Sequence, residues 1–543
     1  MANKKYHFLL PVLFAVVLAI GLWGGFQMKE ETVKKVSIIN KKGGTSKFDH
    51  LMNYLNSKYV DTVDQKKLTQ TAIENVLDKL DPHSFYIPPQ DLENVNNSLE
   101  GKFEGIGIEF FIVNDTITVV SPISGGPSEK LGIRAGDKIV EIEDTSVAGK
   151  GITNKDVIDK LRGPKGSEVT ISIKRPNEDE LIPYTITRDK IPIHSVDVGY
   201  MINDRIGYIK ISRFSGKTFD EFAEKLKTLL DEDMKKLILD LRQNPGGYLG
   251  ASTLLADEFL SGRKMIVYTE GKSYQRKAYK AKNPGRFEEG ELAILIDEGS
   301  ASASEIVAGA VQDWDRGTVI GRRSFGKGLV QEQFQMEDGS ALRLTVARYH
   351  TPSGRCIQKP YGDDNQEYYR EIANRFQNGE YVHPDTSTPS DSLLYTTSEG
   401  DTVYGGGGIM PDIFVPMDTS GNMRYYSKLR AKIPPFVYGY YADHKELFKE
   451  VENPRTYREI FQLPGQTYRA FLSYAEEQGI PIKEDELGEL KPRITTTLKA
   501  YLGRQMWRNK GYYPVMNTID TTFQSALKKL STDTTILTKV QNE

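Results

Sequence analysis

In the middle third of the chain, apolar runs alternate with amphipathic stretches, and this alternation restricts the fold more than any other feature. The runs at 206–211, 236–241 and 292–296 have the length and composition of buried strands. The stretches 219–230 and 249–260 have apolar residues at helical spacing. Strands that alternate with helices in this way indicate an α/β core whose sheet is covered by helices.

Length and composition exclude several classes of protein. A chain of 543 residues is long enough for several domains. Its formal net charge of −3 gives no general attraction to nucleic acid, so we expect no nucleic-acid partner. The single cysteine, Cys356, excludes an intrachain disulfide and a zinc site built from cysteines. The seven histidines show no metal-ligand spacing, so we expect no metal and no other cofactor.

The N-terminus is predicted to lie in a membrane. Lys4 and Lys5 precede an apolar run at 8–28, and about 20 apolar residues suffice to cross a bilayer as a helix. Lysines before the run favour a cytoplasmic N-terminus, and no Ala-x-Ala cleavage site is evident. We interpret residues 1–28 as an uncleaved signal anchor of a single-pass protein in the bacterial inner membrane, with the body of the protein on the periplasmic side. A cleaved signal peptide and a free periplasmic protein are the alternative.

The flanking segments suggest further modules. Residues 29–45 are polar and suit a linker, and helical spacing predicts a small helical module at 46–98. The polar segment at about 361–400 has the composition of an insertion. Residues 420–543 have helical periodicity and many tyrosines, which predicts a mainly helical C-terminal extension whose role the sequence does not indicate.

Residues 100–178 contain short β-rich segments and glycine turns. Ser128 is predicted to cap a short helix that ends at Gly132, and a second helix is predicted at 154–161. With the Gly-Ile-Gly-Ile sequence at 105–108, the segment resembles a PDZ domain. A structural β-domain without a ligand is the alternative.

The PDZ resemblance implies a peptide-binding site. Consecutive N–H groups in a glycine turn can hold a carboxylate, and an open strand edge can accept a peptide as an added strand. The predicted contact residues are those of the glycine turn: Gly105, Ile106, Gly107 and Ile108. Arg162, at the end of the second helix, is a candidate for coupling peptide binding to catalysis, and a solvated arginine at a helix end is the alternative.

The stretch 299–331 carries the candidate chemistry. Ser300, Ser302 and Ser304 lie where an apolar strand meets a helix, and Lys327 follows on a turn flanked by glycines. A hydroxyl needs a base to become a nucleophile, and a lysine with a lowered pKa can be that base. The pattern predicts a serine hydrolase with a Ser/Lys dyad, but the spacing does not choose among the serines.

Both dyad candidates also have a structural interpretation. Ser302 and Glu305 form an S-x-x-E capping box, and most lysines are solvated. To act as a base near neutral pH, Lys327 must lose about three pKa units from about 10.4, which burial beside Phe325 could supply. A nearby carboxylate would oppose that shift, so we interpret Asp313 as structural.

Together, these motifs resemble the C-terminal processing peptidases, also called tail-specific proteases. The resemblance covers about residues 46–416, and its matching segments are 240–247, 300–306, 312–313, 325–331 and 405–409. It implies a crotonase/ClpP-like protease core at 190–416 with an inserted PDZ domain.

The resemblance also assigns roles. The family's nucleophile falls on Ser302, its general base on Lys327 and its supporting glutamine on Gln331. The implied oxyanion hole consists of backbone N–H groups, that of Ala303 and that of Gly246 or Gly247.

The resulting expectation is an endopeptidase that recognises the free C-terminal tail of exported proteins and cleaves them. The sequence does not indicate whether it acts as a homo-oligomer or with an adaptor. One alternative is a catalytically silent PDZ scaffold, against which the intact Ser302, Lys327 and Gln331 argue. Another is a crotonase-type acyl-CoA enzyme, against which the PDZ insertion and the lack of an evident CoA-phosphate site argue.

Overall fold

The computed structural model describes residues 47–175, 178–362, 365–384 and 393–531. The predicted signal anchor at 1–28 and the linker at 29–45 lie outside these residues. Within the described part of the chain, none of the helices combines the length and the apolar character needed to span a membrane.

The chain divides into two compact units, residues 1–72 and 73–543. In the first unit the described residues form α2 (Lys47–Lys58) and the beginning of α3 (Gln65–Asp78). Both helices follow the apolar spacing seen in the sequence. α2 has no buried residue, so its apolar stripe gains little from packing within its own unit.

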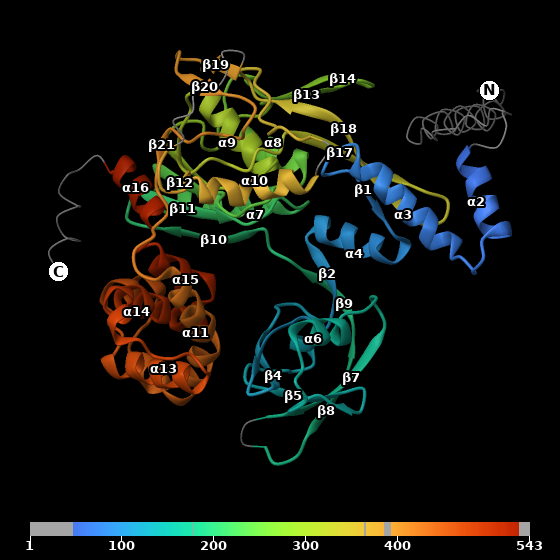
Figure 1. Cartoon of the computed structure of the whole chain (residues 1–543). Coiled ribbons are helices and arrows are strands. Elements are labelled where there is room, and N and C mark those ends of the chain that lie inside the picture. The colour runs from blue at the N-terminus through green and yellow to red at the C-terminus, as the bar shows by residue number, and fades with distance from the viewer. Residues whose placement is uncertain (1–46, 176–177, 363–364, 385–392, 532–543) are drawn as a thin grey trace, which may run out of the picture. The chain divides into compact units, whose positions relative to one another are not determined.

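A six-stranded sheet forms the centre of the second unit (Figure 1). β10 pairs antiparallel with β11, and every other neighbouring pair is parallel. In spatial order the strands are β10 (Val196–Met201), β11 (Ile206–Ile211), β12 (Lys236–Asp240), β15 (Glu291–Ile296), β16 (Thr318–Gly321) and β21 (Ile413–Phe414). The apolar runs of the sequence therefore form the central strands.

Side chains alternate across this sheet, and both faces are covered. Leu237 and Leu239 of β12 pack beneath α7 (Thr218–Asp231), α8 (Leu249–Asp257) and α9 (Ala303–Asp313). Ile238 points to the opposite face, where α16 (Thr521–Leu530) supplies Phe523 and Leu530. Because both faces are buried, the strands are apolar throughout, as a parallel sheet requires.

α16 corrects one prediction. Residues 420–543 were predicted to form a separate, mainly helical extension of unknown role, but α16 covers one face of the core sheet. Its amphipathic pattern shows that it needs a partner surface without showing which surface that is.

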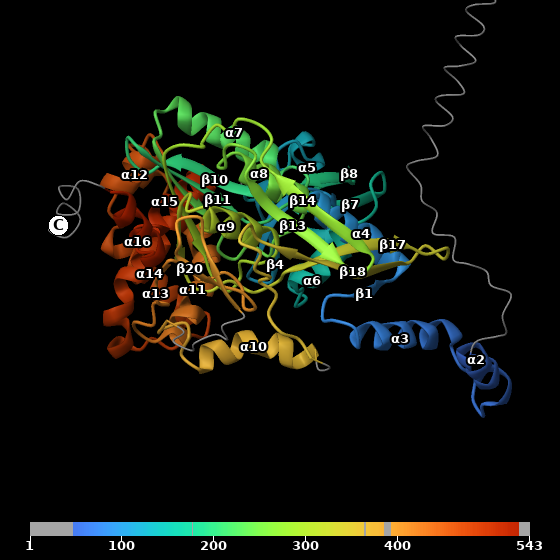
Figure 2. The ribbon, with the colours of Figure 1, turned by 90° about the horizontal axis from the view of Figure 1, so that it is seen from above.

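The second sheet of the protease part has five antiparallel strands. Two hairpins contribute most of it and are adjacent in Figure 2. Their strands are β13 (Met265–Gly271), β14 (Tyr274–Lys280), β17 (Leu329–Gln335) and β18 (Ala341–His350). The fifth strand, β1 (Phe85–Ile87), pairs with β18. The predicted helical module at 46–98 thus contains a strand of the protease part, followed by α4 (Pro89–Glu100).

The PDZ-like segment forms its own sheet in the order β3-β4-β5-β7-β8. These strands are β3 (Ile108–Val113), β4 (Thr116–Pro122), β5 (Lys138–Ile142), β7 (Glu168–Lys174) and β8 (Ile182–Thr187), with β6 (Thr145–Ser146) beside β5. The sheet continues through β8, beyond the predicted limit at 178. β2 (Lys102–Gly105) and β9 (Asp189–Pro192) pair where the chain enters and leaves this segment.

The two predicted helices are present, but one cap was assigned wrongly. α6 (Asn154–Leu161) has the predicted bounds and is capped by Thr153. α5 (Pro127–Lys130) begins after Gly126, because Pro127 occupies the first helical position that proline favours. Ser128 instead donates its hydroxyl to the Ile106 carbonyl at 2.6 Å.

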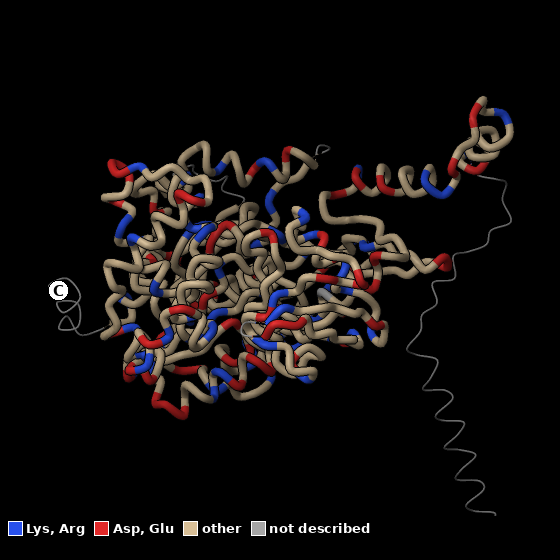
Figure 3. Tube along the Cα trace, turned by 90° about the horizontal axis from the view of Figure 1, so that it is seen from below, with Lys and Arg blue, Asp and Glu red and all other residues tan. Residues whose placement is uncertain are grey.

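The remaining segments are mostly helical. The predicted insertion contains α10 (Asn365–Gln377), β19 (Leu394–Thr396) and β20 (Thr402–Tyr404). The C-terminal helices that share an apolar, tyrosine-rich core are α11 (Met423–Asp443), α12 (Pro454–Ile460), α13 (Gly465–Glu477), α14 (Glu484–Trp507) and α15 (Asn509–Met516). Acidic and basic residues are interspersed along the trace (Figure 3), in keeping with the small net charge.

Candidate active site

Ser302 occupies the corner between strand β15 and helix α9. Its backbone has φ +54° and ψ −110°. Such a conformation costs a non-glycine residue about 1–3 kcal/mol, and strain of this kind is concentrated at functional sites. The corner turns the side chain outward at the N-terminus of the helix, where backbone N–H groups are available.

The two neighbouring serines have different surroundings. Ser300 and Ser304 are completely buried. The Ser300 hydroxyl donates to the Leu241 carbonyl at 2.9 Å, and the Ser304 hydroxyl donates to the Asn244 carbonyl at 3.0 Å. Ser302 keeps part of its surface exposed. Accessibility thus separates three serines that the sequence spacing could not.

The carboxylate of Glu305 joins the serine corner to the loop that carries the lysine. Glu305 is completely buried. Its Oε2 accepts the N–H groups of Ser302 at 2.7 Å and of Lys327 at 2.9 Å. Its Oε1 accepts the Gly326 N–H at 2.8 Å and the Ser324 hydroxyl at 2.5 Å. One side chain therefore holds both candidate catalytic residues by their backbones.

Burial raises the pKa of Glu305 to about 7, against the opposing effect of its four hydrogen-bond donors. The sequence motif identified Glu305 only as a capping residue. The bond to Ser302 is half of that capping box, but the bonds to the distant loop leave no local signal in the sequence.

Tyr349 of β18 supports the same junction. Its hydroxyl lies 3.1 Å from the carbonyl of Ser302 and also contacts the carbonyl of Lys327. Burial raises the pKa of Tyr349 well above its usual range, so the phenol remains a neutral donor.

Lys327 has surroundings suited to a base. Burial, followed by the positive charge of Arg343, lowers the pKa of the Lys327 amine, while Glu305 and Asp81 oppose this shift. Its Nζ donates to Gln331 Oε1 at 3.3 Å. The Lys327 side chain is thus bonded to Gln331, and the backbone N–H groups of Lys327 and Ser302 share the Glu305 carboxylate.

The glycine turn after β12 lies against the serine corner. A Cβ built on Gly246 would come within 2.8 Å of Ser302 Cβ and 2.9 Å of the Ala303 nitrogen. Gly246 and Gly247 have φ values of +93° and +144°, which side chains disfavour. The Gly246 N–H already donates to Asn244 Oδ1 at 2.9 Å. Gly247 is therefore the stronger glycine candidate to pair with Ala303 in an oxyanion hole.

An ion-pair cluster fixes the start of this turn. Asp240 pairs with Lys210 at 3.1 Å and with Arg242 at 2.6 Å, and Arg242 reaches Asp520 at 2.8 Å. Asp520 caps α16, so the C-terminal helix is tied to the glycine turn. The sequence contained no signal for this link across 278 positions.

Asp313 lies in a separate buried ion pair. Its Oδ1 accepts from Arg355 at 2.7 Å, and both side chains are completely buried. Its Oδ2 accepts the Ser353 N–H at 2.8 Å. These contacts agree with the structural interpretation of Asp313.

The predicted carboxylate loop of the PDZ-like segment is anchored by its carbonyls. The Ile106 carbonyl accepts from both the N–H and the hydroxyl of Ser128, and the Gly107 carbonyl accepts from Ile123. Gly105 forms an isolated bridge with Arg162, whose guanidinium lies 4.9 Å from the Phe103 ring. Ile108 begins β3, the edge strand of the sheet.

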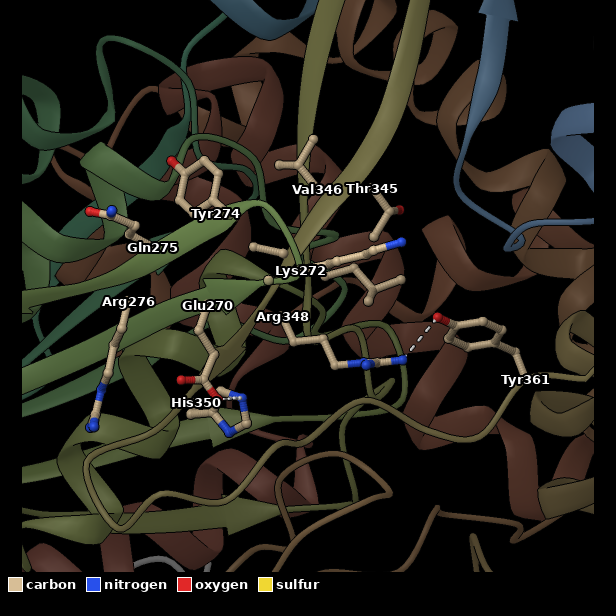
Figure 4. A pocket seen from close by; sticks show the side chains of 13 residues that line it. Glu270, Lys272, Tyr274, Gln275, Arg276, Thr345, Val346, Arg348, His350 and Tyr361 are labelled. Atoms are coloured by element: carbon tan, nitrogen blue, oxygen red, sulfur yellow. Dashed lines mark hydrogen bonds and ion pairs between the residues drawn. The ribbon is translucent and has the colours of Figure 1, made fainter.

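A groove of about 670 Å³ runs over the β13–β14 hairpin and β18 (Figure 4). Lys272, Arg276 and Arg348 give it a basic lining, and Arg348 donates to Tyr361 at 3.3 Å. Leu329, two positions after Lys327, forms part of its wall.

Comparison with known proteins shows which family the chain belongs to. Residues 205–365 match the model of peptidase family S41, and residues 118–175 match a PDZ domain. A carboxy-terminal-processing protease of Bartonella bacilliformis is 38% identical over 317 residues, which are 58% of this chain and 72% of that protein. The chain belongs to the carboxy-terminal processing proteases of peptidase family S41.

The chain is also similar to other known proteins. The carboxy-terminal processing protease CtpB of Bacillus subtilis is 35% identical over 316 residues, 58% of this chain and 65% of that protein. A solved photosystem II D1 C-terminal processing protease is 27% identical, with a TM-score of 0.37, covering 69% of this chain and 87% of that one. Residues 425–508, beyond the protease part, match a family of unknown function, DUF8443.

Membership identifies the chain as a serine-type peptidase with a PDZ domain. The acyl-CoA alternative is thereby set aside.

Proposed function

We propose that this protease cleaves protein substrates with Ser302 as nucleophile and Lys327 as general base, after binding their C-terminal tails through the PDZ domain. The observation that carries the proposal is the Glu305 carboxylate, which binds the backbone of both residues. The lowered pKa of Lys327 supports the role of a neutral amine.

The proposed reaction has two stages. Ser302 Oγ attacks the scissile carbonyl carbon while the Lys327 amine takes the hydroxyl proton. The N–H groups of Ala303 and Gly247 stabilise the oxyanion that forms. The Lys327 ammonium then gives its proton to the leaving amine, and an acyl-enzyme remains.

The second stage regenerates the enzyme. A water molecule attacks the acyl carbonyl, and the neutral Lys327 amine takes its proton. Collapse of the second tetrahedral intermediate returns that proton to Ser302 Oγ and releases the new carboxylate. Gln331 Oε1 accepts one amine N–H throughout, which directs the nitrogen lone pair.

The PDZ domain would select the substrate. β3 is an edge strand, so a peptide can add beside it, and its terminal carboxylate would meet the N–H groups at residues 105–108. Arg162 is bridged to Gly105 and is placed to respond to an occupied loop.

The proposed location is the outer side of a bacterial inner membrane, with exported proteins as substrates. This rests on the apolar run at 8–28 of the sequence, and a cleaved, periplasmic form is the alternative. For the core, the parallel sheet with helices on both faces is what a crotonase/ClpP-like fold would contain.

Peptide turnover tests the proposal. The full-length protein should cleave a peptide with a free, apolar C-terminus, and Ser302→Ala should not, while unfolding at a similar temperature because a cap is worth only about 1 kcal/mol. Mass spectrometry of proteins trapped by Ser302→Ala would identify natural substrates. Cleavage by Ser302→Ala at the wild-type rate would reject the dyad, and a wild type that cleaves no peptide would support the silent scaffold.

A further inference from the structure

A turn far from the dyad in sequence reaches its supporting glutamine. This turn, Asp81–Ser84, is called here the Asp81 turn. Asp81 is buried and accepts the N–H groups of His83 and Ser84 at its Oδ1, each at 2.9 Å. Its Oδ2 accepts the Ser84 hydroxyl at 2.6 Å. Three hydrogen bonds to one carboxylate therefore define the conformation of the turn.

Two other elements hold the turn in place. Thr345 of β18 donates its hydroxyl to Asp81 and its N–H to Ser84 Oγ, both at 3.0 Å. From α10, Tyr369 donates to the Pro82 carbonyl at 2.6 Å, and the Tyr368 hydroxyl lies 2.9 Å from His83 Nε2. The carbonyl of His83 is thus fixed relative to β18 and to α10.

That carbonyl decides how the Gln331 amide is oriented. Gln331 Nε2 donates to the His83 carbonyl oxygen, across 248 positions of sequence. A carbonyl oxygen can only accept, so the amide nitrogen must face the turn. The amide oxygen must then face the other way, where it accepts from Lys327 Nζ at 3.3 Å. If the amide were reversed, it would present N–H groups to the amine and could not hold its lone pair toward the serine.

We infer that the Asp81 turn is part of the catalytic machinery, with Asp81 as the positioning residue that sets the Gln331 amide and, through it, the Lys327 amine. The inference rests on the proposed dyad. It assigns a function to a segment that lies outside the matched protease region at 205–365.

The charged and titratable groups that face Lys327 provide a second test of the inference. They are Arg343 on β18, Glu305 on α9, and Asp81 and His83 on the turn. Asp81 favours the protonated amine, as does acceptance by Gln331 Oε1. Loss of the Asp81 charge should therefore make Lys327 easier to deprotonate, whether the effect is direct or runs through Gln331.

His83 does not complicate this signature. Burial, with the positive charges of Lys327 and Lys359, lowers the pKa of His83 to about 4, and Asp81 opposes the shift. The imidazole is neutral across the working range and stays neutral when Asp81 loses its charge.

A double-mutant cycle tests the path through the glutamine. The variants are Asp81→Ala, Gln331→Ala and their combination in the full-length protein, with kcat/KM measured on one peptide. Each single variant should lose about ten- to a hundredfold, as misplacement of a catalytic group does. In the Gln331→Ala background, Asp81→Ala should cost less than about threefold, because the group it positions is already gone. Losses that multiply would overturn the inference.

The second measurement uses Asp81→Asn, which keeps the shape and one acceptor oxygen and so avoids gross disruption of the turn. The acidic limb of its kcat/KM profile should move to lower pH than in the wild type. The control is Asp91→Asn, an exposed carboxylate in the first turn of α4. A limb that stays in place, or moves to higher pH, would contradict the inference.

These outcomes are separate from failure of the dyad. If Ser302→Ala still cleaves the peptide, the proposed function is wrong whatever the cycle shows. If Ser302→Ala is inactive and the two losses multiply, the dyad stands and the Asp81 turn is merely structural.

Discussion

At the serine corner and in the PDZ loop, backbone groups are suited to bind a carboxylate. The two regions differ in whether that carboxylate belongs to the protein itself or to a substrate. At the corner, the N–H groups of Ser302, Gly326 and Lys327 bind Glu305 of the same chain. In the PDZ loop, the carbonyls of Ile106 and Gly107 are anchored, and the N–H groups of residues 105–108 would meet the carboxylate of a substrate.

This difference explains the behaviour expected of each region. The Glu305 side chain belongs to the protein and is always in place, so it can hold strained residues such as Ser302 in position. A ligand's carboxylate arrives only on binding, so the loop can discriminate among chain ends. We therefore expect changes at the corner to abolish catalysis and changes at the loop to weaken selection.

Replacement of Lys327 should have the largest effect. Lys327→Ala should lower kcat/KM by at least about 10³-fold, since general-base catalysis contributes up to about 10⁴. Lys327→Arg should be equally inactive, because a guanidinium does not deprotonate at usable pH. Peptide turnover measures both, and activity in the arginine variant above one tenth of wild type would contradict a lysine base.

Glu305→Gln should come next. The amide has one acceptor oxygen in place of two, so it presents N–H groups to two of the four donors that Glu305 binds. We expect about a hundredfold loss of kcat/KM from misalignment. Activity within threefold of wild type would show that the corner does not need its internal carboxylate.

Glu305 should also shape the pH dependence of stability. Its folded-state pKa, about 7, lies above the ordinary value of 4.5 for a glutamate side chain. The folded state therefore binds the extra proton, and the contribution of Glu305 to the free energy of unfolding is lost as pH rises from 4.5 to 7. The loss amounts to about 3 kcal/mol. Denaturant unfolding at several pH values should show a flatter profile for Glu305→Gln than for the wild type.

The PDZ loop should respond more weakly. Amidating the C-terminus of a substrate removes its charge and one acceptor, and hydrogen bonds to charged groups are worth about 1.5–3 kcal/mol. Amidated peptides should thus show kcat/KM values that are lower by about tenfold or more, mainly through KM. Equal turnover of the free acid and the amide would show that the PDZ loop does not recognise the C-terminal carboxylate. The proposed role of the serine corner would be unaffected.

The sequence predicts features that depend on neighbouring residues better than features that depend on contacts between residues far apart in the chain. The central strands and α6 carry local patterns, which are apolar runs and helical spacing, whereas the roles proposed for Ser302, Lys327 and Gln331 came from the family resemblance of their motifs. The choice of Ser302 over its neighbours by exposure required the strand β12 and its turn, which bury the hydroxyls of Ser300 and Ser304.

The parts that were missed depend on distant partners. β1 is a three-residue strand that forms only beside β18, and α16 has an ordinary amphipathic pattern that names no partner surface. The contact between the Asp81 turn and Gln331 joins two polar groups with no periodicity between them. Ser128 was misassigned because a serine near the start of a helix can bond elsewhere instead of capping it, here to the Ile106 carbonyl.

The smallest effects should come from Ser300→Ala and Ser304→Ala. Each removes one buried hydrogen bond, worth about 1 kcal/mol of stability, and leaves the candidate nucleophile in place. Both variants should keep more than about a third of wild-type activity while unfolding at slightly lower denaturant concentration. If one of these variants is inactive while Ser302→Ala is active, the nucleophile is the serine replaced in the inactive variant and not Ser302.

The most direct test of the central claim is to map where a serine-reactive fluorophosphonate attaches. The full-length protein is labelled, digested and sequenced by tandem mass spectrometry, with Lys327→Ala in parallel. The account predicts one modified residue, Ser302, whose labelling stops peptide cleavage and is nearly absent in Lys327→Ala. A label on Ser300 or Ser304, or undiminished labelling of Ser302 without the lysine, would contradict it.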